Sequence, residues 1–301
     1  MGKTATPPRL VRLETVDLPV REASGIATRV LGDRLRVMVL GDRTAHVAAA
    51  DVEAGGRLGT WQHLDLSALP GWPVPAADSQ LEAVAADGGT LVALMTEDPP
   101  VVLVGDTVTH ELRARITLTA PAGSPLHGRW DDPSSRGEGL VLLRGGRLLV
   151  AKEKHPRALV EFGPPGMPAR GVGRDDFLAP DESWDPPAGE VDYVAGAMWR
   201  LKGGAKDALR DVSALAVGRD RSLWLLSDKS VSIARLALDL PLEPDDDEIR
   251  ELDELWRLPK GTKKPEGFVA LDDHRLLIAM DTPDEVGNGV IVERPGSAGA
   301  P

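Results

Sequence analysis

Hydrophobic residues are distributed along this chain in short paired runs, and each pair is joined by a turn. Five segments share one order: an acidic residue, a mostly apolar run, a turn of Gly, Asp or Arg, a second apolar run and another acidic residue. The turns include Gly88-Gly89, Gly145-Gly146 and Asp272-Asp273, residue types that tolerate a positive φ in tight hairpins. This order predicts repeated β-hairpins, which start at Glu22, Glu82, Glu138, Asp211 and Glu266.

The apolar runs do not alternate with polar residues. Every position is apolar in 140–143 (LVLL) and 148–151 (LLVA), so both faces of these strands are expected to be covered. Each run is too short for a helix and is bounded by turn residues. More polar runs follow, as at 101–118 and 231–238, which is typical of outer strands nearer solvent. Four strands per repeat predict the blade of a β-propeller.

We therefore predict an all-β protein with a single β-propeller domain over residues 1–301, of five blades or, as the alternative, six. The repeat starts are 60, 56, 73 and 55 residues apart, which is longer than the roughly 40 to 45 residues of WD-type blades, so long loops are expected. The Pro-, Gly- and Asp-rich residues 163–189 are expected to form an extended loop or lid before a strand at 191–201. The predicted blades cover 22–79, 82–136, 138–209, 211–264 and 266–293.

The last repeat lacks a clear fourth strand, because the chain ends in a short tail, 294–301, that is expected to be flexible. A strand-like segment, residues 9–18, precedes the first repeat. We expect this N-terminal strand to be the outer strand of the last blade and so to close the ring.

A hairpin returns the chain to the level at which it started. The acid that opens the first strand and the acid that ends the second are therefore expected on one face of the propeller. Inner strands surround the axis, so this predicts a ring of carboxylates at one end of the central channel. The expected pairs are Glu22 with Asp42, Glu82 with Glu97 or Asp98, Glu138 with Glu153, Asp211 with Asp228, and Glu266 with Asp281.

Such a ring requires protein cations, a bound metal or raised pKa values. A structural ring of salt bridges and a Ca²⁺ or Mg²⁺ site both remain open, since hard oxygen ligands suit these ions. The candidate metal ligands are Glu22, Glu82, Glu138, Asp211 and Glu266. The candidate ligand-binding residues beside them are Arg21, Arg136, Arg210, Lys264, Lys154, Asp228 and Asp281.

Glu138, Glu153 and His155 are the candidate catalytic residues. A carboxyl group whose pKa is raised by its neighbours, or His155 at the rim, could serve as general acid or base. The histidines lack metal-ligand spacing, and the chain has no serine nucleophile elbow, P-loop or dinucleotide fingerprint. Trp130 and Trp184, in predicted loops beside acidic residues, are either core residues or residues at the mouth of a ligand site.

Composition narrows the class of partner. With 47 acidic and 35 basic residues the net charge is -12, so nucleic acid and anionic membrane surfaces are repelled on average. The absence of cysteine excludes disulfides, thiolate metal sites and cysteine nucleophiles. No apolar stretch approaches the roughly 18 residues of a membrane span, and the N-terminus has no uninterrupted apolar segment. We expect a cytoplasmic monomer whose partner is a small molecule or a protein.

The repeats resemble the SdiA-regulated and esterase-like phytase propellers over roughly residues 20–293. The matching segments are Glu138-Gly139-Leu140, Asp211-Val212-Ser213-Ala214-Leu215 with Leu225-Leu226-Ser227-Asp228, and Lys264-Pro265-Glu266-Gly267-Phe268. A more distant resemblance is to the calcium-dependent gluconolactonase and regucalcin propellers, whose metal is held by a glutamate opening an inner strand together with asparagine and aspartate. Glu138 or Glu266 matches that glutamate, whereas the single asparagine, Asn288, stands before an outer strand.

The leading hypothesis is a metal-assisted hydrolase of a small phosphate ester or related ester, with Ca²⁺ or Mg²⁺ and no organic cofactor. The alternative is a non-catalytic propeller that binds a protein or small ligand, with the acids acting as structural ion pairs. Propellers host both kinds of function, so the fold alone does not choose between them.

Overall fold

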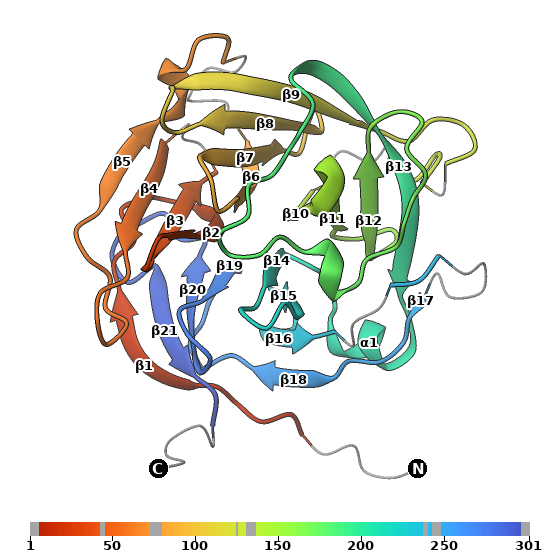
Figure 1. Ribbon diagram of the computed structural model, residues 1–301. Coiled ribbons are helices and arrows are strands. Elements are labelled where there is room, and N and C mark those ends of the chain that lie inside the picture. The colour runs from red at the N-terminus through yellow and green to blue at the C-terminus, as the bar shows by residue number, and fades with distance from the viewer. Residues whose placement is uncertain are drawn as a thin grey trace.

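The computed structural model describes residues 6–42, 46–72, 80–124, 126–130, 137–236, 240–242 and 248–295. Almost all regular structure in them is β-strand; the exceptions are the 3-10 turns η1 (Leu66–Ala68), η4 (Arg144–Gly146) and η5 (Arg174–Asp176) and the short helix α1 (Gly203–Ala208). The strands lie in groups around a common axis (Figure 1), which is the arrangement of a β-propeller. In the described part of the chain, no helix has the length and apolar character needed to cross a membrane.

Each group contains four antiparallel strands, and its first strand lies nearest the axis (Figure 1). The first two groups are β2 (Ala23–Leu31), β3 (Arg34–Gly41), β4 (His46–Asp51) and β5 (Gln62–Asp65), then β6 (Leu81–Ala86), β7 (Leu91–Thr96), β8 (Val101–Asp106) and β9 (Glu111–Thr119). The third contains β10 (Gly139–Leu143), β11 (Arg147–Lys152), β12 (Ala158–Gly163) and β13 (Gly189–Leu201). The fourth group contains β14 (Ala214–Val217), β15 (Leu223–Ser227), β16 (Ser232–Arg235) and β18 (Glu254–Arg257). The fifth begins with β19 (Pro265–Ala270), β20 (Arg275–Met280) and β21 (Gly289–Glu293).

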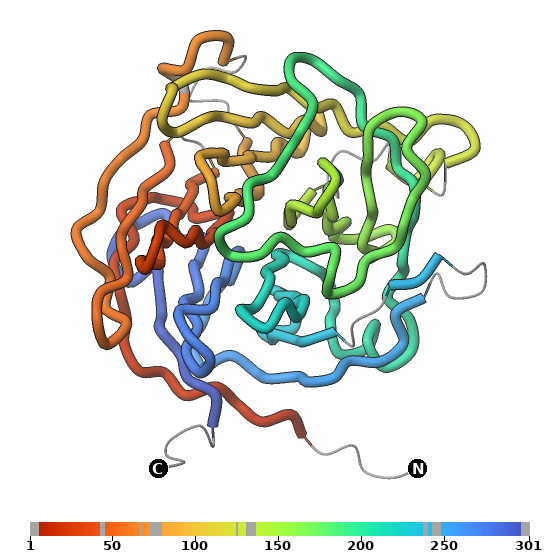
Figure 2. The backbone as a smooth tube through the Cα atoms, viewed as in Figure 1, coloured from red at the N-terminus to blue at the C-terminus, as the bar shows by residue number. Residues whose placement is uncertain are grey.

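The N-terminal strand β1 (Val11–Val16) completes the last group by pairing antiparallel with β21, as the sequence predicts. Figure 2 shows these first and last strands side by side, red beside blue. The fully buried Asn288 joins the same two segments. Its carboxamide accepts a hydrogen bond from the amide of Leu18 and donates to the carbonyls of Leu18 and Val20. The ring is therefore closed by backbone pairing and by one amide side chain.

The second and third groups are joined through their outer strands. β13 is 13 residues long, and its first half pairs parallel with β9, from Gly189 opposite Ala114 to Val194 opposite Thr119. Its second half pairs antiparallel with β12 and parallel with β17 (Glu248–Ile249). The repeat pattern predicts the hairpins but not this fusion into one nine-stranded sheet.

The first strands of neighbouring groups lie in close contact all around the axis, in the order β2, β6, β10, β14, β19 and back to β2. Glycines near their starts permit this approach. A Cβ added to Gly139 would lie 2.6 Å from the amide nitrogen of Leu215, and one added to Gly267 would lie 3.1 Å from that of Ile26. Ser24 also donates a hydrogen bond to the carbonyl of Leu81 in the next group. The strand starts, and the acidic residues beside them, are thus held together.

At the opposite end of the channel, residues 171–188, here named the strap, cross over the hairpin turns (Figure 1). The buried Arg147 anchors the strap, because its guanidinium donates to Glu161 at 2.6 Å, to the carbonyl of Gly171 at 3.1 Å and to Asp176. Further along, Arg144 binds the carboxylate of Glu182. The strap is therefore fixed to the third group by charged hydrogen bonds, which are stronger than neutral ones.

The two tryptophans considered as residues of a ligand mouth are both buried in the core. The indole N–H of Trp184, in the strap, donates to the carbonyl of Leu143, and that of Trp130 donates to the carbonyl of Leu118. A buried tryptophan with a satisfied N–H is a packing residue. The core interpretation is the one that the structure supports.

The close approach at the strand starts can be tested with two glycine substitutions. Gly139→Ala should lower the free energy of unfolding by about 1–3 kcal/mol, because the new methyl group meets backbone atoms of β14 that cannot move aside. Gly163→Ala is the control, since its Cβ would find only ordinary contacts, 3.7 Å from Met167 and 3.8 Å from Arg147. Urea unfolding of both variants measures the difference. Equal stability would show that the strand starts are not tightly packed.

Candidate functional site

The predicted carboxylates gather at the end of the channel where the first strands begin. Glu82, Glu138 and Glu266 stand at the starts of β6, β10 and β19, and all three side chains are partly buried. The charges that act on them come from one another and from acids at the ends of return strands. We name this group the acidic mouth; its return-strand members are Asp42, Glu97, Glu153, Asp228 and Asp281.

The three strand-start glutamates have strongly raised pKa values. Burial, followed by repulsion from Asp42 and other acids, raises the pKa of Glu82 to about 8. Burial and repulsion from Asp228 raise the pKa of Glu266 to about 8, although Lys264 opposes the shift. Burial raises the pKa of Glu138 well above its usual value, and the charges of Glu82 and Glu266 add to this effect. Glu82 and Glu266 are therefore protonated to a large extent at neutral pH.

These three carboxyl groups form no hydrogen bond or ion pair with another residue in the part of the chain that the structure describes. Buried or partly buried carboxyls are usually paired, because an uncompensated charge in such a place is costly. Unpartnered titratable groups with perturbed pKa values are typical of functional sites.

Two of the return-strand acids, unlike the three glutamates, have their negative charge balanced by lysines. Glu153 lies 2.7 Å from the Nζ of Lys154 and 2.6 Å from that of Lys229, and Lys264 forms an ion pair with Asp281. Burial acts to raise the pKa of Glu153, but the two lysines outweigh it and hold that pKa below its usual value. The two lysines therefore favour the charged form of Glu153, whereas burial favours the protonated form of its hairpin partner Glu138.

Asp211 and Glu22 differ from the other strand-start acids. The carboxylate of Asp211 is buried, with 2% of the residue exposed, and it accepts hydrogen bonds from the hydroxyl of Ser227 and the amide of Lys229. It therefore stabilises its own hairpin and has little capacity left for a ligand. The backbone carbonyl of Glu22 accepts from Asp42 as expected for a hairpin. The main charges on Glu82, Glu138 and Glu266 do not include that of Glu22.

The predicted basic residues do not form one ring. Arg21 is exposed and lies 3.5 Å from Glu285, and the Arg210 side chain is exposed. Arg136 lies outside the described residues. His155 is exposed in the turn between β11 and β12, beside Lys154. The cations that the structure brings to the mouth are therefore the lysines Lys154, Lys229 and Lys264.

Lys229 was not among the candidate site residues, although it contacts Glu153 from a different group of strands, 76 residues away in the sequence. The only sequence signal for it is its position directly after Asp228, at the end of a return strand. Its choice of partner depends on how the third and fourth groups face each other, which no local pattern specifies.

A divalent cation fits this mouth only in part. Among the described residues, no group of three or more His, Asp or Glu side chains is arranged to hold a metal ion. The described carboxylates therefore do not by themselves form the set of six to eight oxygen ligands that Ca²⁺ takes. Mg²⁺ commonly uses one or two carboxylates and completes its shell with water and substrate oxygens. Glu82 and Glu266 can supply those carboxylates.

Comparisons with known proteins give distant similarities. No family model and no curated protein matches this chain. Among solved structures, a calcium-binding regucalcin from Agrobacterium tumefaciens is 13% identical, with 96% of this chain and 95% of that chain covered and a TM-score of 0.49. A gluconolactonase from Xanthomonas campestris is 13% identical (97% and 96% covered, TM-score 0.48). Virginiamycin B lyase from Staphylococcus aureus is 10% identical (93% and 97% covered, TM-score 0.46).

These values are too low to support an argument about the site. The resemblance to the SdiA-regulated and phytase-like propellers is not tested by them and stays a prediction.

The raised pKa values predict an unusual dependence of stability on pH. Between the pKa of an unfolded glutamate, about 4.3, and the folded value of about 8 for Glu82 and Glu266, the folded protein holds more protons, so stability falls as the pH rises. Glu82→Gln or Glu266→Gln should therefore stabilise the protein at pH 9 by about 1–3 kcal/mol and change little at pH 5.

Thermal or urea unfolding from pH 5 to 9 measures this effect. Glu285→Gln, at an exposed position, is the matched control and should leave the pH dependence unchanged. Identical pH profiles for the wild type and the Glu82 and Glu266 variants would show that these carboxyls ionise normally.

Proposed function

We propose that the acidic mouth is the active site of a hydrolase that acts on a small phosphate ester or another small ester. The observation that carries the proposal is the contrast between Glu138 and Glu153, which lie just before the first strand and just after the return strand of one hairpin. The pKa of Glu138 is raised and that of Glu153 is lowered. Two carboxyl groups whose environments separate their pKa values in this way are suited to act as acid and base.

Glu138 would act as the general acid. Because burial favours its protonated form and it has no partner among the described residues, it would donate a proton to the oxygen of the leaving group. Glu153, held charged by Lys154 and Lys229, would accept a proton from the attacking water. The same lysines, with Lys264, would attract an anionic substrate to a mouth that is otherwise acidic.

Glu82 and Glu266 would hold a divalent cation, for which Mg²⁺ is the better match. When bound, the ion would polarise the substrate and lower the pKa of a bound water. The two carboxylates would ionise on binding it, since a nearby positive charge lowers their pKa values from about 8.

We further propose that each four-stranded group is one blade of a five-bladed propeller, and that the protein is a cytoplasmic monomer, as the sequence predicts. A second function is favoured by the ion pairs of Glu153 and Asp281, which could be structural. In that case the mouth would bind a small ligand or a protein partner without catalysis.

Hydrolysis of p-nitrophenyl phosphate, p-nitrophenyl acetate and a set of lactones, with Mg²⁺, Ca²⁺ or EDTA present, tests the enzymatic proposal. Glu138→Gln should lower kcat by about 10²–10⁴-fold, the usual contribution of a general acid, and leave the fold intact. Glu285→Gln is the control for a lost surface carboxylate. Absence of hydrolysis in the wild type under every condition would favour the binding function, and full activity of Glu138→Gln would exclude its proposed role.

The two carboxyl roles also predict a bell-shaped dependence of kcat/KM on pH. The acid limb should follow ionisation of Glu153 and the alkaline limb should follow loss of the proton from Glu138. Lys229→Met removes one of the two lysines that lower the pKa of Glu153, so it should move the acid limb to higher pH. Lys202→Met, at a half-buried ion pair with Glu248, should leave both limbs in place.

A further inference from the structure

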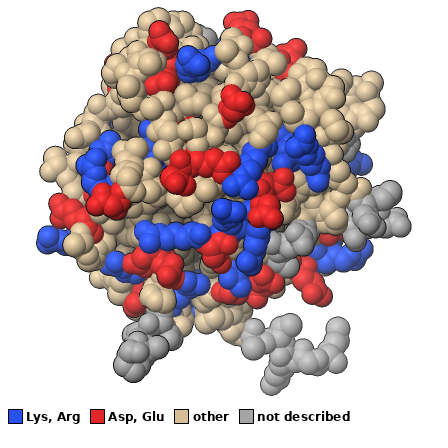
Figure 3. Space-filling view, viewed as in Figure 1, with Lys and Arg blue, Asp and Glu red and all other residues tan. Residues whose placement is uncertain are grey.

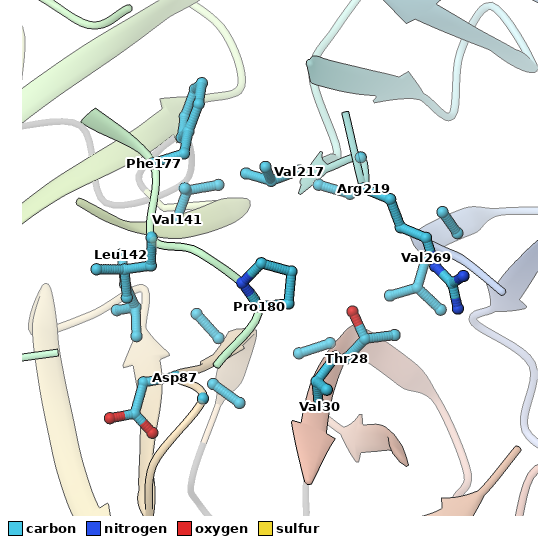
Figure 4. Close-up of a pocket in the computed structure, with 18 of the residues that line it drawn as sticks. Thr28, Val30, Asp87, Val141, Leu142, Phe177, Pro180, Val217, Arg219 and Val269 are labelled. Atoms are coloured by element: carbon cyan, nitrogen blue, oxygen red, sulfur yellow. The ribbon is translucent and has the colours of Figure 1, made fainter. Parts of the chain in front are cut away.

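The end of the channel opposite the acidic mouth contains a cavity of about 430 Å³. Residues from the first strand of every group form its walls, and strap residues 177–180 cover one side of it. Figure 4 shows Pro180 of the strap in the middle of the view, with Val141, Val217, Val269 and Thr28 around it. A volume of this size falls in the roughly 300–1,000 Å³ range of small-molecule sites.

The walls of this strap cavity are mainly apolar. Val141, Leu142, Val217, Val269 and Phe177 are among its apolar side chains, and Thr28 adds one hydroxyl group. The cover is rigid, because the strap is fixed by the Arg147 and Arg144 contacts. A largely preformed apolar cavity favours a ligand with a substantial hydrocarbon part.

The acidic group in the cavity wall is already satisfied. Asp87, with 2% of the residue exposed, accepts hydrogen bonds from the amides of Gly89, Leu91 and Trp184. It also lies 3.7 Å from the buried guanidinium of Arg29. Asp87 therefore fixes the strap to the second group and is not free to bind a cationic ligand.

The rim has three arginines, and they differ in their partners. Arg34 is paired with Asp51 at 2.8 Å, and Arg221 lies 3.6 Å from the fully exposed Asp175. Arg219 donates one hydrogen bond, to the carbonyl of Leu271 at 3.1 Å. Neither Asp33, which also lines the rim, nor any other acid in the described part of the chain forms an ion pair with it. Arg219 thus keeps several N–H donors for a ligand.

The rest of this face, over the residues that the structure describes, has no charged patch that would select a ligand of one charge. Figure 3 shows the face seen in Figure 1, where basic and acidic side chains alternate and do not form separate patches. The selective polar group at the cavity is therefore Arg219, and a guanidinium is best matched by a planar carboxylate, which it can bind with two parallel hydrogen bonds.

We propose that the strap cavity binds a small, mostly apolar carboxylate, such as an aromatic acid. The hydrocarbon part lies between the first strands beneath Pro180, and the carboxylate binds Arg219 at the rim. This site is separate from the acidic mouth. The excess of carboxylates there would repel a simple carboxylate ligand. The inference does not depend on the hydrolase proposal.

Isothermal titration calorimetry with 2-naphthoate and its neutral analogue 2-naphthamide tests this assignment on the full chain. The wild type should bind 2-naphthoate with one saturable site, at least 10-fold more tightly than the amide. Arg219→Gln should bind the two compounds with similar affinity, because only the interaction with the carboxylate is removed. Val217→Phe, which fills the cavity, should weaken both by 10-fold or more.

Arg21→Gln is the matched control, an exposed arginine away from the cavity, and should keep the preference for the acid. Thermal melts of each variant establish that it is folded. The proposal is overturned if 2-naphthoate gives no saturable binding, if it binds no better than the amide, or if folded Arg219→Gln or Val217→Phe behaves as the wild type.

Discussion

Close packing of the first strands around the channel axis determines where the acidic side chains of the mouth lie. Glycines at 25, 139 and 267 allow neighbouring backbones to touch, and Ser24 and Ser213 bind carbonyls of the next group. The acids beside these strand starts cannot move apart without breaking that packing. The hydrophobic core therefore holds Glu82, Glu138 and Glu266 in a charge arrangement that electrostatics alone would disfavour.

Much of this arrangement is local and could be predicted from the sequence. Turn residues and apolar runs specify each hairpin, and a hairpin must place Glu138 near Glu153 and Glu266 near Asp281. The state of each acid could not be predicted, because it depends on contacts between groups. Asp211 bonds within its own hairpin, whereas Glu153 receives Lys229 from another group. The parallel pairing of β9 with β13 and the position of the strap also depend on contacts between groups. They could not be predicted for the same reason.

The two ends of the channel differ in chemistry although one set of strands builds both. β6 illustrates this, since Glu82 near its start has no partner among the described residues, while Asp87 just past its end accepts three backbone amides. The same class of side chain has a raised pKa in one setting and a structural role in the other, and the difference is the supply of hydrogen-bond donors. At the other end, the strap cavity has mainly apolar walls, and its acid Asp87 is already satisfied by backbone amides.

The contacts of Asn288 have a consequence for the order in which the protein folds. Its carboxamide joins positions separated by 270 residues, and β1 pairs with β21 over a similar span. During synthesis on a ribosome, the last hairpin emerges long after β1, so the N-terminal strand must wait without its partner while the other groups form. Contacts of such large sequence separation are slow to form. Sealing of the ring is therefore expected to be the final and slowest step in folding of this propeller, and it requires that synthesis has passed β21.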